Sequence, residues 1–302
     1  MSGPTTKSYA AMSSEQEITD ASKLDPDAGI PKPTFGAFLE NINLAKEPVG
    51  RLEIETVRQA LMAHRILAFP MQRFDESEGG PVHRLVDTAK KLFNNELEEV
   101  GDDKFVQLYV SEGGRTDTLN SDLFHSDLSY KSTPASVTML WALEVPRGPG
   151  DSTVFVNMAA IAQALPPMLR LKLEGKTARH ELDGWAVRGG SPSKSVAADH
   201  PVLRNHPVTG EEILFVSPSY TTSIEGDTDG TLMRQLFDMI EDKRFHMTFN
   251  YQAGDLVMWD NASVLHKATT MDLPEGKSRV MMRISVLGRG DGKFNPLSTE
   301  HL

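Results

Sequence analysis

The stretch SVTMLWALEV (residues 136–145) is the first of five short apolar runs in a chain of 302 residues. The other four are TVFVN (153–157), ILFVSP (213–218), DLVMWD (255–260) and RVMMRISVLG (279–288). Glycine, proline and aspartate separate the runs, which is typical of strands joined by turns in a sandwich or barrel. The sequence therefore predicts a mainly β fold.

Helices are predicted around this β-rich region. LEIETVRQALMAHR (52–65) has apolar residues at helical spacing and leads into ILAFP (66–70), a strand candidate. Further helices are expected within 81–98, near 158–174 and near 229–243. Residues 1–33 are polar and show no sustained apolar period, so we expect a flexible N-terminal arm followed by a single domain over 34–302.

Composition excludes several classes of function. The formal net charge of −11 makes a nucleic-acid partner unfavourable. Because the chain has no cysteine, any metal site must use histidine and carboxylate. No apolar run approaches the ~18 residues that span a bilayer, and the N-terminus lacks the pattern of a signal peptide. We therefore expect a cytoplasmic protein with no membrane partner.

Two histidines and an aspartate form a candidate metal site. In LFHSDLSY (123–130), His125 and Asp127 would point to the same face if the segment is a strand. The alternative is that Asp127 starts a turn and His125 is a half-buried ring. His266, in GDLVMWDNASVLHKAT (254–269), follows Asp127 by 139 positions, so only the fold can bring the three together. Two histidines and one carboxylate form the facial triad of non-haem Fe(II) sites that activate oxygen.

Two arginines on the last predicted strand suggest recognition of anions. Arg279 and Arg283 are four positions apart, so on a strand their side chains point to the same face. Burying two cations there is costly unless each has an anionic partner, and guanidinium binds carboxylate bidentately. The alternative is a pair of surface salt bridges.

Four segments, in this order, resemble the taurine dioxygenase family of Fe(II)- and 2-oxoglutarate-dependent dioxygenases, which includes the phenoxyalkanoate herbicide dioxygenases. They are FHSD (124–127), VPRGPGDSTVFVN (145–157), HPVLRNHPVTGEEILFVSPSYTTSIEG (200–226) and WDNASVLHKAT (259–269). The similarity covers most of residues 120–290. In the third segment we interpret His200 and His206 as structural histidines.

The resemblance implies a double-stranded β-helix, or jelly roll, with flanking helices. It implies that His125, Asp127 and His266 ligate Fe(II), and that O2 and 2-oxoglutarate are cosubstrates. Arg279 matches the arginine that binds the distal carboxylate of 2-oxoglutarate, and Arg283 matches the arginine that holds an anionic substrate. Ser152 matches the family threonine that supports the 2-oxoglutarate carboxylate, unless Thr153 supplies that hydroxyl.

The expected activity is oxidation of a small anionic molecule such as a sulfonate or carboxylate, by hydroxylation that can end in cleavage, with release of succinate and CO2. The same chemistry could instead tailor an amino acid or secondary metabolite by hydroxylation or desaturation. A cupin-like binding protein and a zinc hydrolase are alternatives of other classes. Relatives are commonly dimers or tetramers, which allows a homo-oligomer here. The polar stretch 111–122 is either a solvated loop or a lid over the metal.

Overall fold

The structure is a computed structural model of the chain. It describes residues 19–20, 35–46, 49–76, 79–93, 96–100, 105–115, 120–182 and 195–288. The expected N-terminal arm over 1–33 lies outside these residues, apart from the strand β1 (Thr19–Asp20). Part of the stretch 111–122, predicted as either a solvated loop or a lid, also lies outside them. The single domain over 34–302 stays a prediction.

The helices lie where their apolar spacing predicts them. They are α1 (Arg51–His64), α2 (Gly80–Phe93), α3 (Met158–Ala164), α4 (Pro167–Leu173) and α5 (Thr231–Ile240). The region near 158–174 forms two helices rather than one, because Pro166 and Pro167 follow Leu165, where α3 ends. Proline fixes its backbone φ angle and lacks an N–H, so it starts a helix more readily than it continues one.

Strands make up most of the regular structure, as the apolar runs predict. A seven-stranded sheet has the order β1, β2 (Ala37–Phe38), β3 (Ile66–Phe69), β13 (Leu256–Asp260), β5 (Ala135–Glu144), β15 (Ser278–Leu287) and β4 (Gln107–Glu112). A three-stranded sheet has the order β12 (His246–Asn250), β6 (Ser152–Asn157) and β14 (Val264–Ala268). The mainly β class with flanking helices is confirmed.

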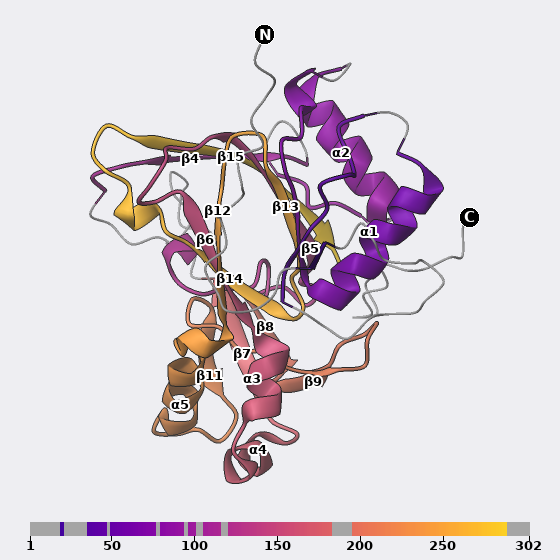
Figure 1. Ribbon diagram of the computed structural model, residues 1–302. Coiled ribbons are helices and arrows are strands. Elements are labelled where there is room, and N and C mark those ends of the chain that lie inside the picture. Colours follow the sequence, from indigo (N-terminus) through magenta and orange to yellow (C-terminus); the bar gives the residue numbers. More distant parts are fainter. Residues whose placement is uncertain are drawn as a thin grey trace.

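The two sheets pack face to face, and side-chain alternation explains how. On β13, Leu256 and Met258 belong to the apolar cluster formed with α1 and α2, which cover the outer face of the large sheet (Figure 1). Val257 and Trp259 point to the other face and pack against the small sheet, where Phe155 is a partner. Successive residues of a strand serve opposite faces, so one short run builds both layers.

A second group of elements extends from the small sheet (Figure 1). It contains α3, α4 and α5, the sheet β11 (Thr221–Ile224), β7 (Thr177–Leu182), β8 (Val196–Pro201), and the pair β9 (Leu203–Asn205) and β10 (Glu212–Leu214). A separate buried apolar cluster holds these elements on β6 and β14 through Val156 and Leu265. Within the described ranges no helix has the length and apolar character to cross a membrane.

The segment 123–130 is not a strand. His125 forms an isolated antiparallel bridge with His266, and Asp127 begins a turn in which Leu128 has a φ of 58°. The conditional expectation of a strand was therefore wrong, and the turn at Asp127 was the correct alternative. The side chains of His125 and Asp127 nevertheless converge, because the turn directs the aspartate toward the same pocket as the bridged histidine.

Candidate metal centre

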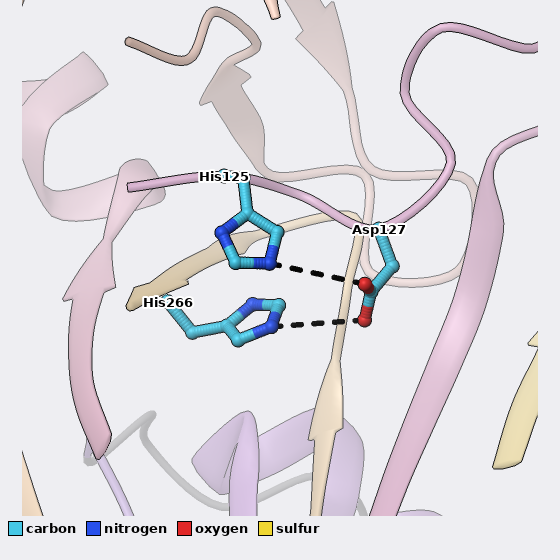
Figure 2. Close-up of side chains that lie close together, drawn as sticks. All are labelled: His125, Asp127 and His266. Atoms are coloured by element: carbon cyan, nitrogen blue, oxygen red, sulfur yellow. Dashed lines mark ion pairs between the residues drawn. The ribbon is translucent and has the colours of Figure 1, made fainter. Parts of the chain in front are cut away.

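The fold brings His125, Asp127 and His266 together, and all three are buried (Figure 2). The Nε2 atom of His125 lies 3.9 Å from Oδ1 of Asp127, and the Nε2 atom of His266 lies 3.7 Å from Oδ2. One ligand atom from each residue lies within 4.8 Å of the other two. This spacing allows one metal ion to reach all three.

Backbone pairing fixes the two histidines relative to each other. The His125 N–H donates to the carbonyl of His266 at 3.1 Å, and the His266 N–H donates to the carbonyl of His125 at 2.9 Å. His266 lies on β14, which is itself paired with β6. The metal-binding histidines are therefore held by the sheet and not only by their side-chain rotamers.

Asn261, from the Trp-Asp-Asn segment, holds the turn that contains Asp127. Its Oδ1 accepts a hydrogen bond from the Asp127 N–H at 2.9 Å, and its Nδ2 donates to the Asp127 carbonyl at 3.0 Å and the Ala135 carbonyl at 2.9 Å. Ser126 donates from its hydroxyl to the Asn261 carbonyl at 2.9 Å. Asn261 thus ties both metal-ligand segments together, although the sequence analysis gave it no role.

The neighbouring Asp260 joins this segment to the HP-containing segment. The Nδ1 atom of His206 accepts hydrogen bonds from the N–H groups of Val208 and Thr209, which places the ring proton on Nε2, and Nε2 lies 3.1 Å from Oδ2 of Asp260. His200 bonds the Ser129 carbonyl through Nε2 at 2.8 Å. Both contacts fit the structural roles expected for the two histidines.

The protonation of the triad suits metal binding. Burial lowers the pKa of His125, and burial together with His125 lowers the pKa of His266 to about 3. Both rings are therefore neutral at physiological pH. Nδ1 of His125 lies 2.8 Å from the Leu123 carbonyl, which suits an N–H donor and leaves the lone pair on Nε2 for a metal.

Asp127 remains ionised because it has strong partners. Burial alone would raise the pKa of its carboxyl, but Arg283 and the two triad histidines outweigh burial and hold that pKa well below its usual range. Arg283 donates from Nη1 to Oδ1 at 2.7 Å, and Thr138 donates its hydroxyl to Oδ2 at 2.6 Å. A carboxylate oxygen has two lone pairs, so both contacts leave capacity for a metal.

The triad faces a pocket between the two sheets. Trp259, Met281, Arg279 and Arg283 line it from the large sheet, while Thr153 and His266 line it from the small one. Both arginines thus face the same cavity, as their even spacing predicts.

Arg279 is buried without a carboxylate partner among the residues that the structure describes. Its Nη2 donates to the Thr153 hydroxyl at 3.2 Å, its guanidinium lies 5.0 Å from the ring centre of Tyr251, and its Nε has no hydrogen-bond partner. Burial lowers its pKa. Such a cation calls for an anion from outside the chain.

Of the two hydroxyls that the sequence left open, Thr153 is the one beside Arg279. Ser152 instead lies 2.5 Å from both Asp151 Oδ1 and Asn250 Oδ1, and it does not line the pocket. Adjacent residues of β6 point to opposite faces, which explains why only one of them can reach Arg279.

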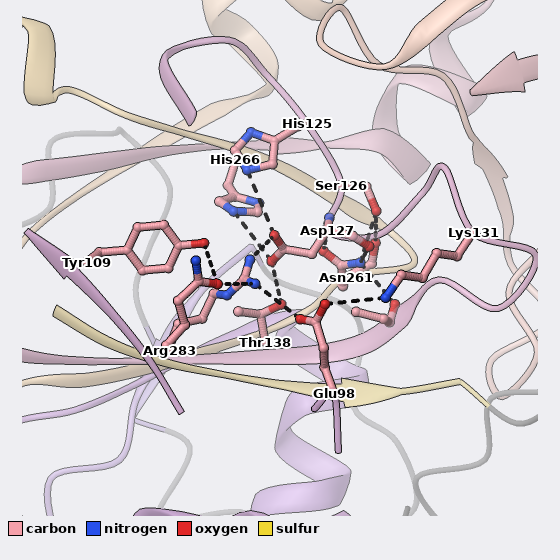
Figure 3. A network of polar contacts seen from close by, with 12 residues as sticks. Glu98, Tyr109, His125, Ser126, Asp127, Lys131, Thr138, Asn261, His266 and Arg283 are labelled. Carbon is pink, nitrogen blue, oxygen red and sulfur yellow. Dashed lines mark hydrogen bonds and ion pairs between the residues drawn. The ribbon is translucent and has the colours of Figure 1, made fainter. Parts of the chain in front are cut away.

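Arg283 has acceptors on both sides (Figure 3). Besides Asp127, its Nη2 donates to Oε2 of Glu98 at 3.1 Å and to Oε1 of Gln107 at 2.9 Å. Its pKa is raised, because its carboxylate partners outweigh the lowering by burial. The sequence analysis missed Glu98, Gln107 and Thr138, since nothing in their local sequence marks them as neighbours of Asp127.

Comparisons with known proteins agree with this geometry. Residues 26–285 match the model of the taurine catabolism dioxygenase TauD, TfdA family. An α-ketoglutarate-dependent 2,4-dichlorophenoxyacetate dioxygenase of Cupriavidus pinatubonensis is 28% identical over 265 residues, which cover 80% of this chain and 91% of the relative. The α-ketoglutarate-dependent dioxygenase cnsM of Penicillium expansum is 34% identical over 176 residues, 54% of this chain and 49% of the relative.

The match therefore spans about half the length of several curated relatives, cnsM among them. A crystal structure of a taurine dioxygenase from Burkholderia xenovorans aligns with a TM-score of 0.70 and 24% identity, covering 87% of this chain and 93% of that chain. At 24% identity, this similarity to a solved structure shows a shared fold.

Proposed function

We propose that this chain, which belongs to the taurine catabolism dioxygenase TauD, TfdA family, is an Fe(II)- and 2-oxoglutarate-dependent dioxygenase. Its reaction would oxidise a small anionic organic molecule and release succinate and CO2. One observation carries the proposal: Arg279, which is buried and has no carboxylate partner among the described residues, opens into the same pocket as the buried triad of His125, Asp127 and His266. A zinc hydrolase with the same triad would leave that arginine without a use.

The donor set fits iron. Two neutral imidazole nitrogens and one carboxylate oxygen leave half of an octahedron open, which is the arrangement used by non-haem Fe(II) oxygenases. His125, Asp127 and His266 would hold the ion. When bound, Fe(II) supplies oxygen activation coupled to the oxidative decarboxylation of 2-oxoglutarate. Thr138 and Arg283 orient the Asp127 carboxylate, as outer partners of metal ligands commonly do.

Arg279 and Thr153 would bind the distal carboxylate of 2-oxoglutarate. The guanidinium offers a bidentate pair of donors, and Nε is available since it has no partner within the described chain. The Thr153 hydroxyl accepts from Arg279 and still has its own proton to donate to the carboxylate. Ser152, the residue matched by the resemblance, keeps its bonds to Asp151 and Asn250.

Arg283 would hold the anionic group of the substrate. It lines the pocket on the same strand as Arg279. The relative from Cupriavidus pinatubonensis is named for 2,4-dichlorophenoxyacetate, a carboxylate, which supports an anion at this position. The two facing sheets and the family likeness support a double-stranded β-helix as the fold. The cytoplasmic location and a homo-oligomer stay predictions.

An anaerobic titration tests the proposal. Apoprotein is mixed with Fe(II) and then with 2-oxoglutarate, and the visible metal-to-ligand charge-transfer band of the chelate is recorded. We expect the band in the wild type and its loss in His266→Ala, which removes one ligand. A wild-type protein that binds iron but shows no band would contradict the use of 2-oxoglutarate.

A further inference from the structure

Glu98 is a buried carboxylate that the proposed chemistry does not use. Its N–H donates to the carbonyl of Ser285 on β15 at 2.9 Å, and the preceding Leu97 forms an antiparallel bridge with Val286. The backbone therefore fixes Glu98 against β15 two positions from Arg283. Only 9% of its surface is exposed.

Glu98 accepts from a donor of Arg283 that an anionic substrate could otherwise use. The Arg283 guanidinium already bonds two carboxylates, Asp127 and Glu98, and the amide oxygen of Gln107 (Figure 3). Asp127 would also bind the metal, so the metal would balance its negative charge. Glu98 is not a metal ligand, and its negative charge opposes the approach of a second anion to Arg283.

Lys131 gives Glu98 a second partner. Its Nζ lies 3.4 Å from Oε1 of Glu98, on the other carboxylate oxygen from the one that accepts from Arg283. Glu98 and Lys131 both line a second hollow that Arg283 does not line, whereas Arg283 lines the pocket with the triad and Glu98 does not. Glu98 thus lines one hollow together with Lys131, while its other partner, Arg283, lines the pocket of the triad.

We propose that Glu98 is a specificity-determining residue that occupies Arg283 in the substrate-free site and is displaced by the anionic group of the substrate. Lys131 keeps the displaced carboxylate paired, which avoids the cost of a buried, unpaired charge. The proposal rests on the proposed function, because it assumes that Arg283 receives an anion. It implies selection for groups that bind guanidinium bidentately, such as carboxylates and sulfonates, over neutral amides.

Calorimetric binding of methanesulfonate to the protein loaded with Mn(II) and 2-oxoglutarate tests this role. In Glu98→Gln the side-chain shape is kept while the competing charge is lost, so we expect methanesulfonate to bind at least about tenfold more tightly than in the wild type. Glu99→Gln is the matched control, because Glu99 is an exposed neighbour with the same charge. We expect it to bind as the wild type does.

Lys131→Met tests the second half of the proposal. Without the Lys131 cation to pair with the displaced Glu98 carboxylate, moving Glu98 away from Arg283 costs more free energy. Methanesulfonate should therefore bind several-fold more weakly than in the wild type. Lys90→Met is its control, because Lys90 lines the same hollow but contacts the Phe105 ring. Equal weakening in both lysine variants would show a general charge effect and overturn the receiving role.

Unchanged, weaker or absent methanesulfonate binding in Glu98→Gln would overturn the role of Glu98, and so would equal tightening in Glu99→Gln. The Fe(II) and 2-oxoglutarate band, recorded on Glu98→Gln, shows whether the site is intact. Absence of that band in the wild type would count against the dioxygenase proposal alone, because methanesulfonate is also titrated into the wild type and Glu98→Gln loaded with Mn(II) only, a comparison that requires neither 2-oxoglutarate nor turnover.

Discussion

Arg279 and Arg283 lie four residues apart on β15 and line the same pocket, yet their surroundings are opposite. Arg279 has one neutral acceptor, the Thr153 hydroxyl. Arg283 has two carboxylates and an amide oxygen. Arg279 thus forms no ion pair within the described residues, although Asp151 lies near enough to act against the lowering of its pKa by burial, whereas Arg283 forms ion pairs with two carboxylates.

This difference shows that an arginine can line a pocket without needing a ligand there to balance its charge. Both arginines face the pocket, but only Arg279 requires an anion from outside the described chain. Nε of Arg283 also has no hydrogen-bond partner within the described residues, but both of its Nη atoms donate to side chains of the protein, so an external anion can bind through Nη only if one of these partners leaves or shares it. Exposure to a cavity is therefore a weaker sign of ligand binding than a missing partner.

The largest expected difference between the two arginines is in stability. Arg283→Met leaves Asp127 and Glu98 buried without their shared cation and should lower the free energy of unfolding by about 3–5 kcal/mol. Arg279→Met removes a charge that has no carboxylate partner and should change it by less than about 1 kcal/mol. Urea denaturation of the metal-free proteins measures both. Equal losses would remove the basis of the comparison.

Ligand binding should reverse that order. Arg279→Met should weaken 2-oxoglutarate binding by about 100-fold, which is close to 3 kcal/mol, because a charge-assisted bidentate contact is lost. Titration of the charge-transfer band gives the dissociation constant. Fe(II) binding before 2-oxoglutarate is the internal control, since Arg279 bonds to none of the three triad residues. Unchanged 2-oxoglutarate affinity would contradict the assignment.

Asp255 is a buried carboxyl that, unlike Asp127, forms no ion pair with a cation among the described residues. Burial raises the pKa of Asp255 to about 6, whereas Asp127, beside Arg283, is shifted the other way. The raised pKa means that folded protein binds this proton more tightly than unfolded protein does. The stability contributed by Asp255 is therefore complete below about pH 4 and is lost as pH rises through about 6.

Asp255→Asn should remove this pH dependence. The difference in free energy of unfolding between Asp255→Asn and wild type should shift in favour of the variant by about 2 kcal/mol between pH 4 and pH 7. Urea denaturation at both pH values measures it, and other titrating groups cancel in the difference. A difference that is constant with pH would show that Asp255 has an ordinary pKa.

The smallest expected effect is on 2-oxoglutarate binding, and it distinguishes the hydroxyls of Ser152 and Thr153 on β6. Thr153→Ala should weaken 2-oxoglutarate binding by about 3- to 10-fold, the value of one hydrogen bond, and Thr153→Ser should restore it. Ser152→Ala should leave 2-oxoglutarate binding close to the wild-type value, because Ser152 bonds to Asp151 and Asn250. The reverse result would return the role to Ser152.

Local patterns were sufficient for much of the fold and for the ligand types. Apolar periodicity placed all the main helices and the strands β5, β6, β13 and β15, because it reports which face of an element is buried. Of ILFVSP (213–218), only Ile213 and Leu214 lie in a strand, β10. For 123–130, where the sequence left a strand or a turn open, the structure has one bridge and a turn. There His125 and Asp127 converge through a turn held by Asn261, which is a long-range contact.

The residue types at the site follow from the sequence alone: two histidines, a carboxylate and two arginines on one face of a strand, with no cysteine to compete for a metal. Which of these groups contact one another follows from the fold. Thr153 rather than Ser152 meets Arg279, and Glu98 meets Arg283 across 185 positions. The reason is physical: alternation along a strand is a local property, whereas pairing across strands depends on register and packing, which bring distant residues together.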